Sequence, residues 1–267
     1  MSMAVCSMTA LELNARALRI RRRIIDLAYQ AGSKGAHIAP SLSIAEIMSV
    51  LMEQMTAQDT LILSKGHGGL GYYCGLAEGG QLPFEVLAQF ERNGGPLPGQ
   101  PSKNPALNIP YSGGSLGMGL PYAVGLAQAK QLSGCAGRLF VILGDGECNE
   151  GVIWEAALMA KKLRLDTLTA IIDCNGMQSD GFTEEVLHED LPKLWTASGW
   201  SCTECDGHDV EALRRTLSSV CINTPTVVIA HTVKGKGVSF MENNRQWHHS
   251  HLSEREYERA KEELYAD

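Results

Sequence analysis

Apolar residues near the start of the chain recur at helical spacing. From Leu13 to Ala31 they fall at alternating intervals of four and three residues, which predicts an amphipathic helix over residues 9–31. The arginines of this segment mostly lie off the apolar stripe, so we expect them to be solvated; they are Arg16, Arg19, Arg21, Arg22 and Arg23. Shorter patterns predict helices over residues 43–55 and 70–78, with a strand at 60–63 between them.

The second half of the chain alternates short apolar segments with helical ones. Strands rich in valine and isoleucine are predicted at 138–143, 168–173, 200–205 and 226–231, and helices at 115–132, 150–163, 190–198, 209–220 and 253–264. Short apolar strands separated by helices are typical of a parallel sheet covered by helices on both faces. We therefore expect an α/β fold, and because no repeat or long linker divides the chain, residues 1–267 are expected to form one domain.

Composition excludes some classes of function. The formal net charge of −7 argues against nucleic acid or an anionic membrane as a partner. The N-terminus lacks the basic region and apolar core of a signal peptide, and no apolar run approaches the roughly 18 residues that span a bilayer. The eight cysteines are scattered, which favours reduced thiols in a cytoplasmic protein.

One cysteine pair raises the question of zinc. Cys202 and Cys205, followed by His208, resemble half of a zinc site, but a structural site needs four ligands and the sequence has no second pair. We interpret this segment as a surface strand and turn.

A glycine-rich turn follows the predicted strand at 138–143. There Gly144, Asp145, Gly146 and Glu147 occupy the carboxyl end of a parallel strand, where ligands bind in open α/β sheets. The glycines allow close approach to a phosphate, and the N-terminus of the next helix favours an anion. A carboxylate beside a phosphate requires a bridging cation, and magnesium or calcium prefers such oxygen ligands.

The next strand supplies further oxygens at the same edge. Asn175 follows Gly146 after 28 intervening residues, the length of one helix and one strand. The amide oxygen of Asn175 and the backbone carbonyl of Met177 would complete the protein's ligands to the cation. The long segment 93–114, dense in glycine and proline, is predicted to be a loop that wanders or wraps a site.

These motifs resemble those of a known family. The spacing between Gly146 and Asn175 is similar to the thiamine-diphosphate motif, and the strings GDGECNEGVIWEAALMAKKL and DCNGMQSDG resemble those of transketolases. Further matches are Gly35-Ala36-His37, Ser64-Lys65-Gly66-His67, the segment from Gly114 to Gly119, Asp206-Gly207-His208-Asp209, and Lys234-Gly235-Lys236-Gly237 through Trp247-His248. The resemblance implies the family's N-terminal, pyrophosphate-binding domain and transfer of a two-carbon ketol unit from a ketose to an aldose.

The resemblance also assigns roles to the cofactor loop. It implies that Asp145, Asn175 and the Met177 carbonyl hold the divalent ion, and that the Gly146 amide contacts the diphosphate. Gly114 and Leu116 would pack against the aminopyrimidine, and Glu150 would link cofactor sites across a subunit interface. Gly144 and Glu147 belong to the same cofactor-binding loop.

On the substrate side, the resemblance points to three histidines, His37, His67 and His248. Imidazole suits proton exchange with sugar hydroxyl groups near neutral pH. Because His249 is adjacent to His248, the role given to His248 could belong to His249 instead. Where the family usually shows Gly-His-Pro, this chain has Gln100 between Gly99 and Pro101. Glutamine cannot carry a proton, so either Gln100 adapts the site to other sugars or the position is tolerant.

The family's activating glutamate and its phosphate-binding residues lie in a second, pyrimidine-binding domain, whereas this chain ends at Asp267. We therefore expect a split transketolase, whose partner is a separate C-terminal subunit in an α2β2 assembly acting on sugar phosphates. Alternatives are another thiamine enzyme, such as a 2-oxo acid dehydrogenase E1 subunit or a deoxyxylulose-phosphate synthase, and a non-catalytic assembly partner. The strings around His37 and His67 favour transketolase, and the presence of Asp145 and Asn175 argues against a non-catalytic role.

Overall fold

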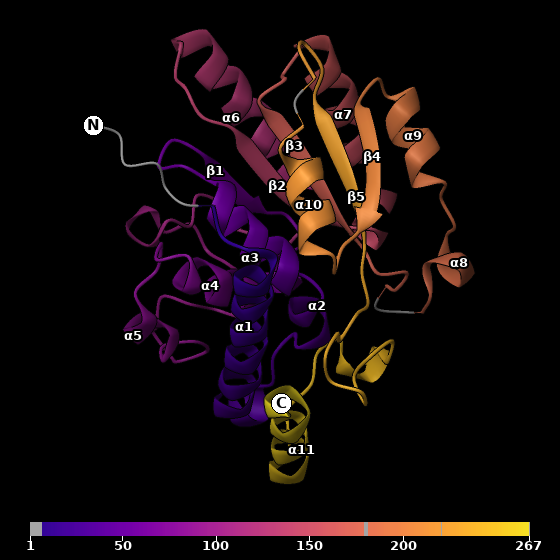
Figure 1. Ribbon diagram of the computed structural model, residues 1–267. Helices are drawn as coiled ribbons and strands as arrows, with labels where there is room; N and C mark the ends of the chain where they lie inside the picture. The colour runs from indigo at the N-terminus through magenta and orange to yellow at the C-terminus, as the bar shows by residue number, and fades with distance from the viewer. Residues whose placement is uncertain (1–6, 179–180, 220, 267) are drawn as a thin grey trace.

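A computed structural model describes residues 7–178, 181–219 and 221–266. Its centre is a parallel sheet whose strands, within the described residues, follow the order β1-β2-β3-β5-β4 (Figure 1). The strands are β1 (Thr60–Leu63), β2 (Leu139–Gly144), β3 (Leu168–Cys174), β4 (Ser201–Asp206) and β5 (Thr226–His231). Each lies within about a residue of its predicted range, so the alternation of apolar segments located the sheet correctly.

One face of the sheet is covered by helices from both ends of the chain. These are α1 (Ala10–Gln30), α3 (Ala45–Gln54), α4 (Gly69–Glu78), α10 (Val210–Leu217) and, packed on α1, α11 (Glu254–Tyr265). Their apolar side chains form one core with Phe140, Ile142 and Val228 of the sheet. The short helices α2 (Ala39–Leu42) and α5 (Phe84–Leu87) were not predicted.

The opposite face is covered by α6 (Gly119–Ser133), α7 (Gly151–Lys162) and α9 (Leu191–Ala197), seen on the other side of the strands in Figure 1. They pack on Val141, Leu143 and Ile172, which alternate along the strands with residues of the first core. Two separate cores on two faces confirm the predicted parallel sheet covered on both sides. The remaining helix, α8 (Thr183–Val186), lies in the loop after β3.

Helix α1 begins where the sequence predicts, because Thr9 and Glu12 form a capping box at its N-terminus. The expectation of solvated arginines is wrong for Arg21, which is 7% exposed. Its guanidinium donates to Glu46 at 2.5 Å, and His208 Nδ1 lies 2.9 Å from the same carboxylate. Burial alone would raise the pKa of Glu46, but Arg21 and His208 lower it to about 2.

Helix α6 begins four residues later than predicted. Gly114 and Gly117 have φ values of 143° and 80°, which helical geometry does not allow. The chain therefore forms an open turn here, and a side chain at Gly117 would meet Glu150 and Val152 at 2.8 Å, so that only glycine fits. This turn brings Leu116 to the carboxyl edge of the sheet. In the described parts of the chain, no helix is long and apolar enough to cross a membrane.

Candidate cofactor site

The loops that follow β1, β2, β3 and β5 meet at the carboxyl edge of the sheet and enclose a cavity of about 120 Å³. Its lining contains most of the residues predicted from the sequence: His67, Leu116, Gly144, Asp145, Gly146, Glu147, Asn175, Met177 and His248. Gln178 and Lys234 complete it. Residues more than 150 positions apart in the chain thus share one small space.

Asp145 is a buried carboxylate held by backbone amides. Its Oδ1 accepts the N–H of Gly146 at 2.8 Å and its Oδ2 accepts the N–H of Gly176 at 2.6 Å. Burial and the nearby charge of Asp173 raise the pKa of Asp145 to about 6. Among the described side chains, no cation forms an ion pair with Asp145, so its charge is left for a ligand to neutralise.

Asn175 and Met177, whose oxygens the sequence predicts to hold a cation, both line the cavity. The Asn175 amide nitrogen donates to Asp173 Oδ2 at 3.1 Å, while its oxygen accepts the Met177 N–H at 3.2 Å. The Met177 carbonyl accepts a hydrogen bond from the Lys234 ammonium at 3.4 Å. One carboxylate, one amide oxygen and one carbonyl thus belong to residues that line one cavity from two strand ends, and such oxygens suit a hard divalent cation.

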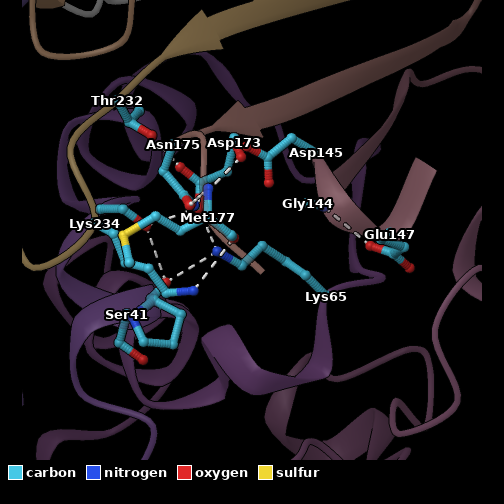
Figure 2. Close-up of polar contacts among 12 residues, drawn as sticks. Ser41, Lys65, Gly144, Asp145, Glu147, Asp173, Asn175, Met177, Thr232 and Lys234 are labelled. Carbon is cyan, nitrogen blue, oxygen red and sulfur yellow. Dashed lines mark hydrogen bonds and ion pairs between the residues drawn. The ribbon is translucent and has the colours of Figure 1, made fainter. Parts of the chain in front are cut away.

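Two buried lysines, for which the sequence predicted no role, flank these oxygens. Lys65 is completely buried and forms an ion pair with Asp173 (Figure 2). Lys234 is 2% exposed, and in the described structure no carboxylate lies within ion-pair distance of it. Burial, with the charge of Lys65, lowers the pKa of Lys234 to about 8. Both residues follow strand ends, so the rule that located Asp145 would also have indicated them.

Glu147 serves mainly to hold this edge of the sheet together. Its carboxylate accepts hydrogen bonds from the Ser64 hydroxyl at 2.5 Å, the Gly117 N–H at 2.8 Å and the Gly144 N–H at 3.0 Å. Figure 2 shows its side chain turned away from the group around Asp173. These bonds fix the open turn before α6 against the ends of β1 and β2.

The three predicted histidines form a cluster, and two of them, His67 and His248, line the cavity. Their ring centroids are separated by 6.2 Å (His37–His67), 5.5 Å (His37–His248) and 5.2 Å (His67–His248). His248 lines the cavity, whereas His249 is exposed and its ring centroid lies 4.6 Å from that of His37. Burial and nearby cationic groups lower the pKa of His37 to about 4 and of His248 to about 3, and the pKa of His67 is also well below its usual value. All three rings are therefore neutral at neutral pH.

Two polar atoms in the lining lack partners. His248 Nδ1 and Gln178 Nε2 are buried without a hydrogen bond from any described residue. Buried polar atoms in native proteins almost always have partners, so this pair indicates a polar ligand. Gln178 stands in the motif that identified Asn175, but no role was predicted for it.

The remaining predicted residues do not line the cavity. The Gln100 side-chain oxygen lies 3.1 Å from the position of a Cβ at Gly66, which precedes His67, and 3.3 Å from one at Gly114. Glu150 is exposed immediately before α7 and makes no capping hydrogen bond. His37, Gln100, Gly114 and Glu150 are thus outside the cavity wall.

Comparison with known proteins identifies the family. The family described as "Transketolase, thiamine diphosphate binding domain" matches residues 15–267. The chain belongs to the transketolase family. Its relatives include a subunit of the apulose-4-phosphate transketolase of Actinobacillus succinogenes, 42% identical over 95% of this chain and 96% of the relative. Another is the 6-deoxy-6-sulfo-D-fructose transketolase subunit SqwG of a Clostridium species, 37% identical over 85% of this chain and 88% of the relative.

Solved transketolases share the fold. The enzyme of Leishmania mexicana superimposes with a TM-score of 0.86 at 27% identity, over 96% of this chain but 41% of the Leishmania chain. The chain therefore spans about two fifths of such transketolases, and a similar share is found for the enzyme of Campylobacter jejuni, at 43%. The resemblance inferred from the motifs is confirmed, and the domain is a thiamine-diphosphate-binding one.

Proposed function

We propose that this chain is the N-terminal subunit of a two-component transketolase, which transfers a two-carbon ketol unit from a ketose to an aldose. The observation that carries the proposal is the convergence of Asp145, Asn175 and the Met177 carbonyl from two strand ends on one cavity. Relatives matched over about nine tenths of their length are themselves named as transketolase subunits. Sugar phosphates are the substrate class that the name of one relative supports.

The site suits thiamine diphosphate with magnesium or calcium. The unneutralised Asp145 carboxylate, the Asn175 amide oxygen and the Met177 carbonyl would hold the cation, and the Gly146 N–H and Lys234 would contact the diphosphate. The unpartnered atoms of Gln178 and His248 offer two further contacts. When bound, thiamine diphosphate supplies the nucleophilic carbon that takes up the two-carbon unit.

The histidine cluster would bind and orient the sugar. A neutral imidazole can accept a proton from a hydroxyl group at one ring nitrogen and donate a hydrogen bond from the other. Because the pKa values of His37 and His248 are about 4 and 3, both rings are available in this form at neutral pH. Gln100, beside Gly114, would contact the same substrate without exchanging a proton.

A second subunit would complete the enzyme and supply the activating glutamate, in an assembly of two copies of each. Exposed apolar residues support such a partner: Met118 immediately precedes α6, Tyr122 and Leu132 lie on α6, and Leu158 and Met159 lie on the neighbouring α7. Leu116, at the cavity, is 37% exposed. Exposed apolar side chains on two neighbouring helices are expected where a partner protein packs.

Co-expression with a neighbouring reading frame that encodes a pyrimidine-binding domain tests the proposal. The purified complex should transfer a two-carbon unit between sugars in the presence of thiamine diphosphate and magnesium, and neither component should do so by itself. The matched control is the same complex carrying Asp145→Ala, which should assemble but remain inactive. Full activity of the lone chain, or of the Asp145→Ala complex, would show that the proposed function is wrong.

A further inference from the structure

Asp173 is the most heavily bonded carboxylate at the carboxyl edge of the sheet. It is completely buried, and donors from four different segments surround it (Figure 2). Ser43 donates its hydroxyl to Oδ2 at 2.7 Å, and the Asn175 amide nitrogen donates to the same oxygen at 3.1 Å. Lys65 also donates to Oδ2, and the Thr232 hydroxyl donates to Oδ1. With these bonds made, Asp173 has little capacity left to bind a ligand itself.

The contact with Asn175 determines which end of that amide faces the cation site. The oxygen and the NH2 group of an asparagine have similar size, so shape alone hardly distinguishes the two orientations. A carboxylate only accepts hydrogen bonds, so it selects the NH2 group. The oxygen then points the other way, where it accepts the Met177 N–H and keeps a second lone pair. An amide turned by 180° would present N–H donors, which cannot bind a cation.

We propose that Asp173 is a positioning residue, which holds the Asn175 amide so that its oxygen faces the divalent cation. This inference rests on the proposed function, because it takes Asn175 to be a ligand. Asp173 lies two residues before Asn175 on the same strand end, and it is anchored by Ser43, Lys65 and Thr232 from three other segments. The amide is thereby oriented before any cation arrives, and no reorganisation is needed on binding.

The alternative role for Asp173 is to compensate the buried charge of Lys65. The two roles can be distinguished with two double variants, both of which lack the charges of Lys65 and Asp173. Lys65→Met with Asp173→Asn leaves an oxygen at position 173 that accepts from Asn175, whereas Lys65→Met with Asp173→Leu leaves none. Asparagine and leucine are similar in size, and replacing a buried ion pair with uncharged residues is often tolerated.

The measurement is binding of Mn2+ in the presence of thiamine diphosphate, followed by electron paramagnetic resonance on the complex of both subunits. We expect the asparagine variant to bind about as tightly as the unchanged protein and the leucine variant ~10–100-fold more weakly, the usual effect of losing a partner of a metal ligand. Equal affinities of the two variants, weakened or not, would overturn the inference.

Two controls complete the design. Asn175→Ala should itself weaken Mn2+ binding. If it does not, Asn175 is not a ligand, and the proposed set of cation ligands is wrong as well as the positioning role of Asp173. The second control is hydrogen exchange of the Asn175 side-chain amide, followed by NMR. It is measured on the unsubstituted protein, so it does not depend on whether a variant folds. Slow exchange is expected for an NH2 group bonded to buried Asp173, and exchange as fast as that of an exposed asparagine would contradict the proposal.

Discussion

The Asp145 carboxylate accepts the Gly176 N–H at 2.6 Å, so the end of β2 is fastened to the turn that follows β3. The two strands are already paired in register up to Gly144 and Asp173. The side-chain bond extends this pairing beyond the sheet, to the residues that carry the proposed ligands. The protein itself therefore holds together the two halves of the proposed cation site.

Replacing Asp145 with asparagine should abolish this site while keeping the fold. Asp145→Asn removes the negative charge that a cation would neutralise, so we expect the affinity for Mg2+ in the presence of thiamine diphosphate to fall by at least ~100-fold. Loss of a residue that only hydrogen-bonds to a metal ligand typically costs ~10–100-fold. The Mg2+ affinity is measured by calorimetric titration in the presence of thiamine diphosphate. Asp206→Asn, at the exposed end of β4, is the control and should change affinity less than ~2-fold. Equal affinities of the two variants would contradict the assignment.

Lys234 should bind the diphosphate, because it is a buried ammonium whose hydrogen-bond partner in the described structure is the Met177 carbonyl. We expect Lys234→Met to weaken thiamine diphosphate binding by ~10-fold or more, since hydrogen bonds to charged groups contribute about 1.5–3 kcal/mol. Lys236→Met removes a half-exposed lysine from the same loop, which pairs with Glu242 at 3.8 Å, and should have little effect. Similar affinities of both variants would exclude a role for Lys234 in binding.

The sequence predicted the sheet and much of the site for a common reason. Alternating apolar segments located the strands, and the rule that ligands bind at strand ends then selected Asp145 and Asn175. Pairings between distant segments were not predictable in this way. Lys65 and Asp173 are 108 residues apart, and nothing in the local pattern of either indicates a buried ion pair. Arg21 was missed likewise, because its partner Glu46 lies on another helix.

The histidine cluster gives a prediction about pH. An unfolded histidine binds its proton near pH 6.5, whereas His37 and His248 in the folded chain have pKa values of about 4 and 3. Lowering the pH below about 6.5 therefore favours the unfolded chain, and the rings stay neutral until the pH approaches those lower values. We expect NMR of the cofactor-free protein to show no titration of either ring between about pH 5.5 and 8. A midpoint near 6.5 for either would be inconsistent with the buried cluster.

The Gln100 side-chain oxygen lies beside Gly114 and beside Gly66, the residue that precedes His67. A neutral hydrogen bond contributes about 0.5–1.5 kcal/mol, so Gln100→His should change the relative kcat/KM across a panel of ketose donors by ~2–10-fold, if the glutamine determines specificity. Gln89→His, an exposed glutamine before the same long loop, provides the matched control and should leave the ratios unchanged. Ratios that are the same in both variants would mean that position 100 tolerates either residue. A uniform loss of activity for all donors would instead assign Gln100 to binding a feature that every donor shares.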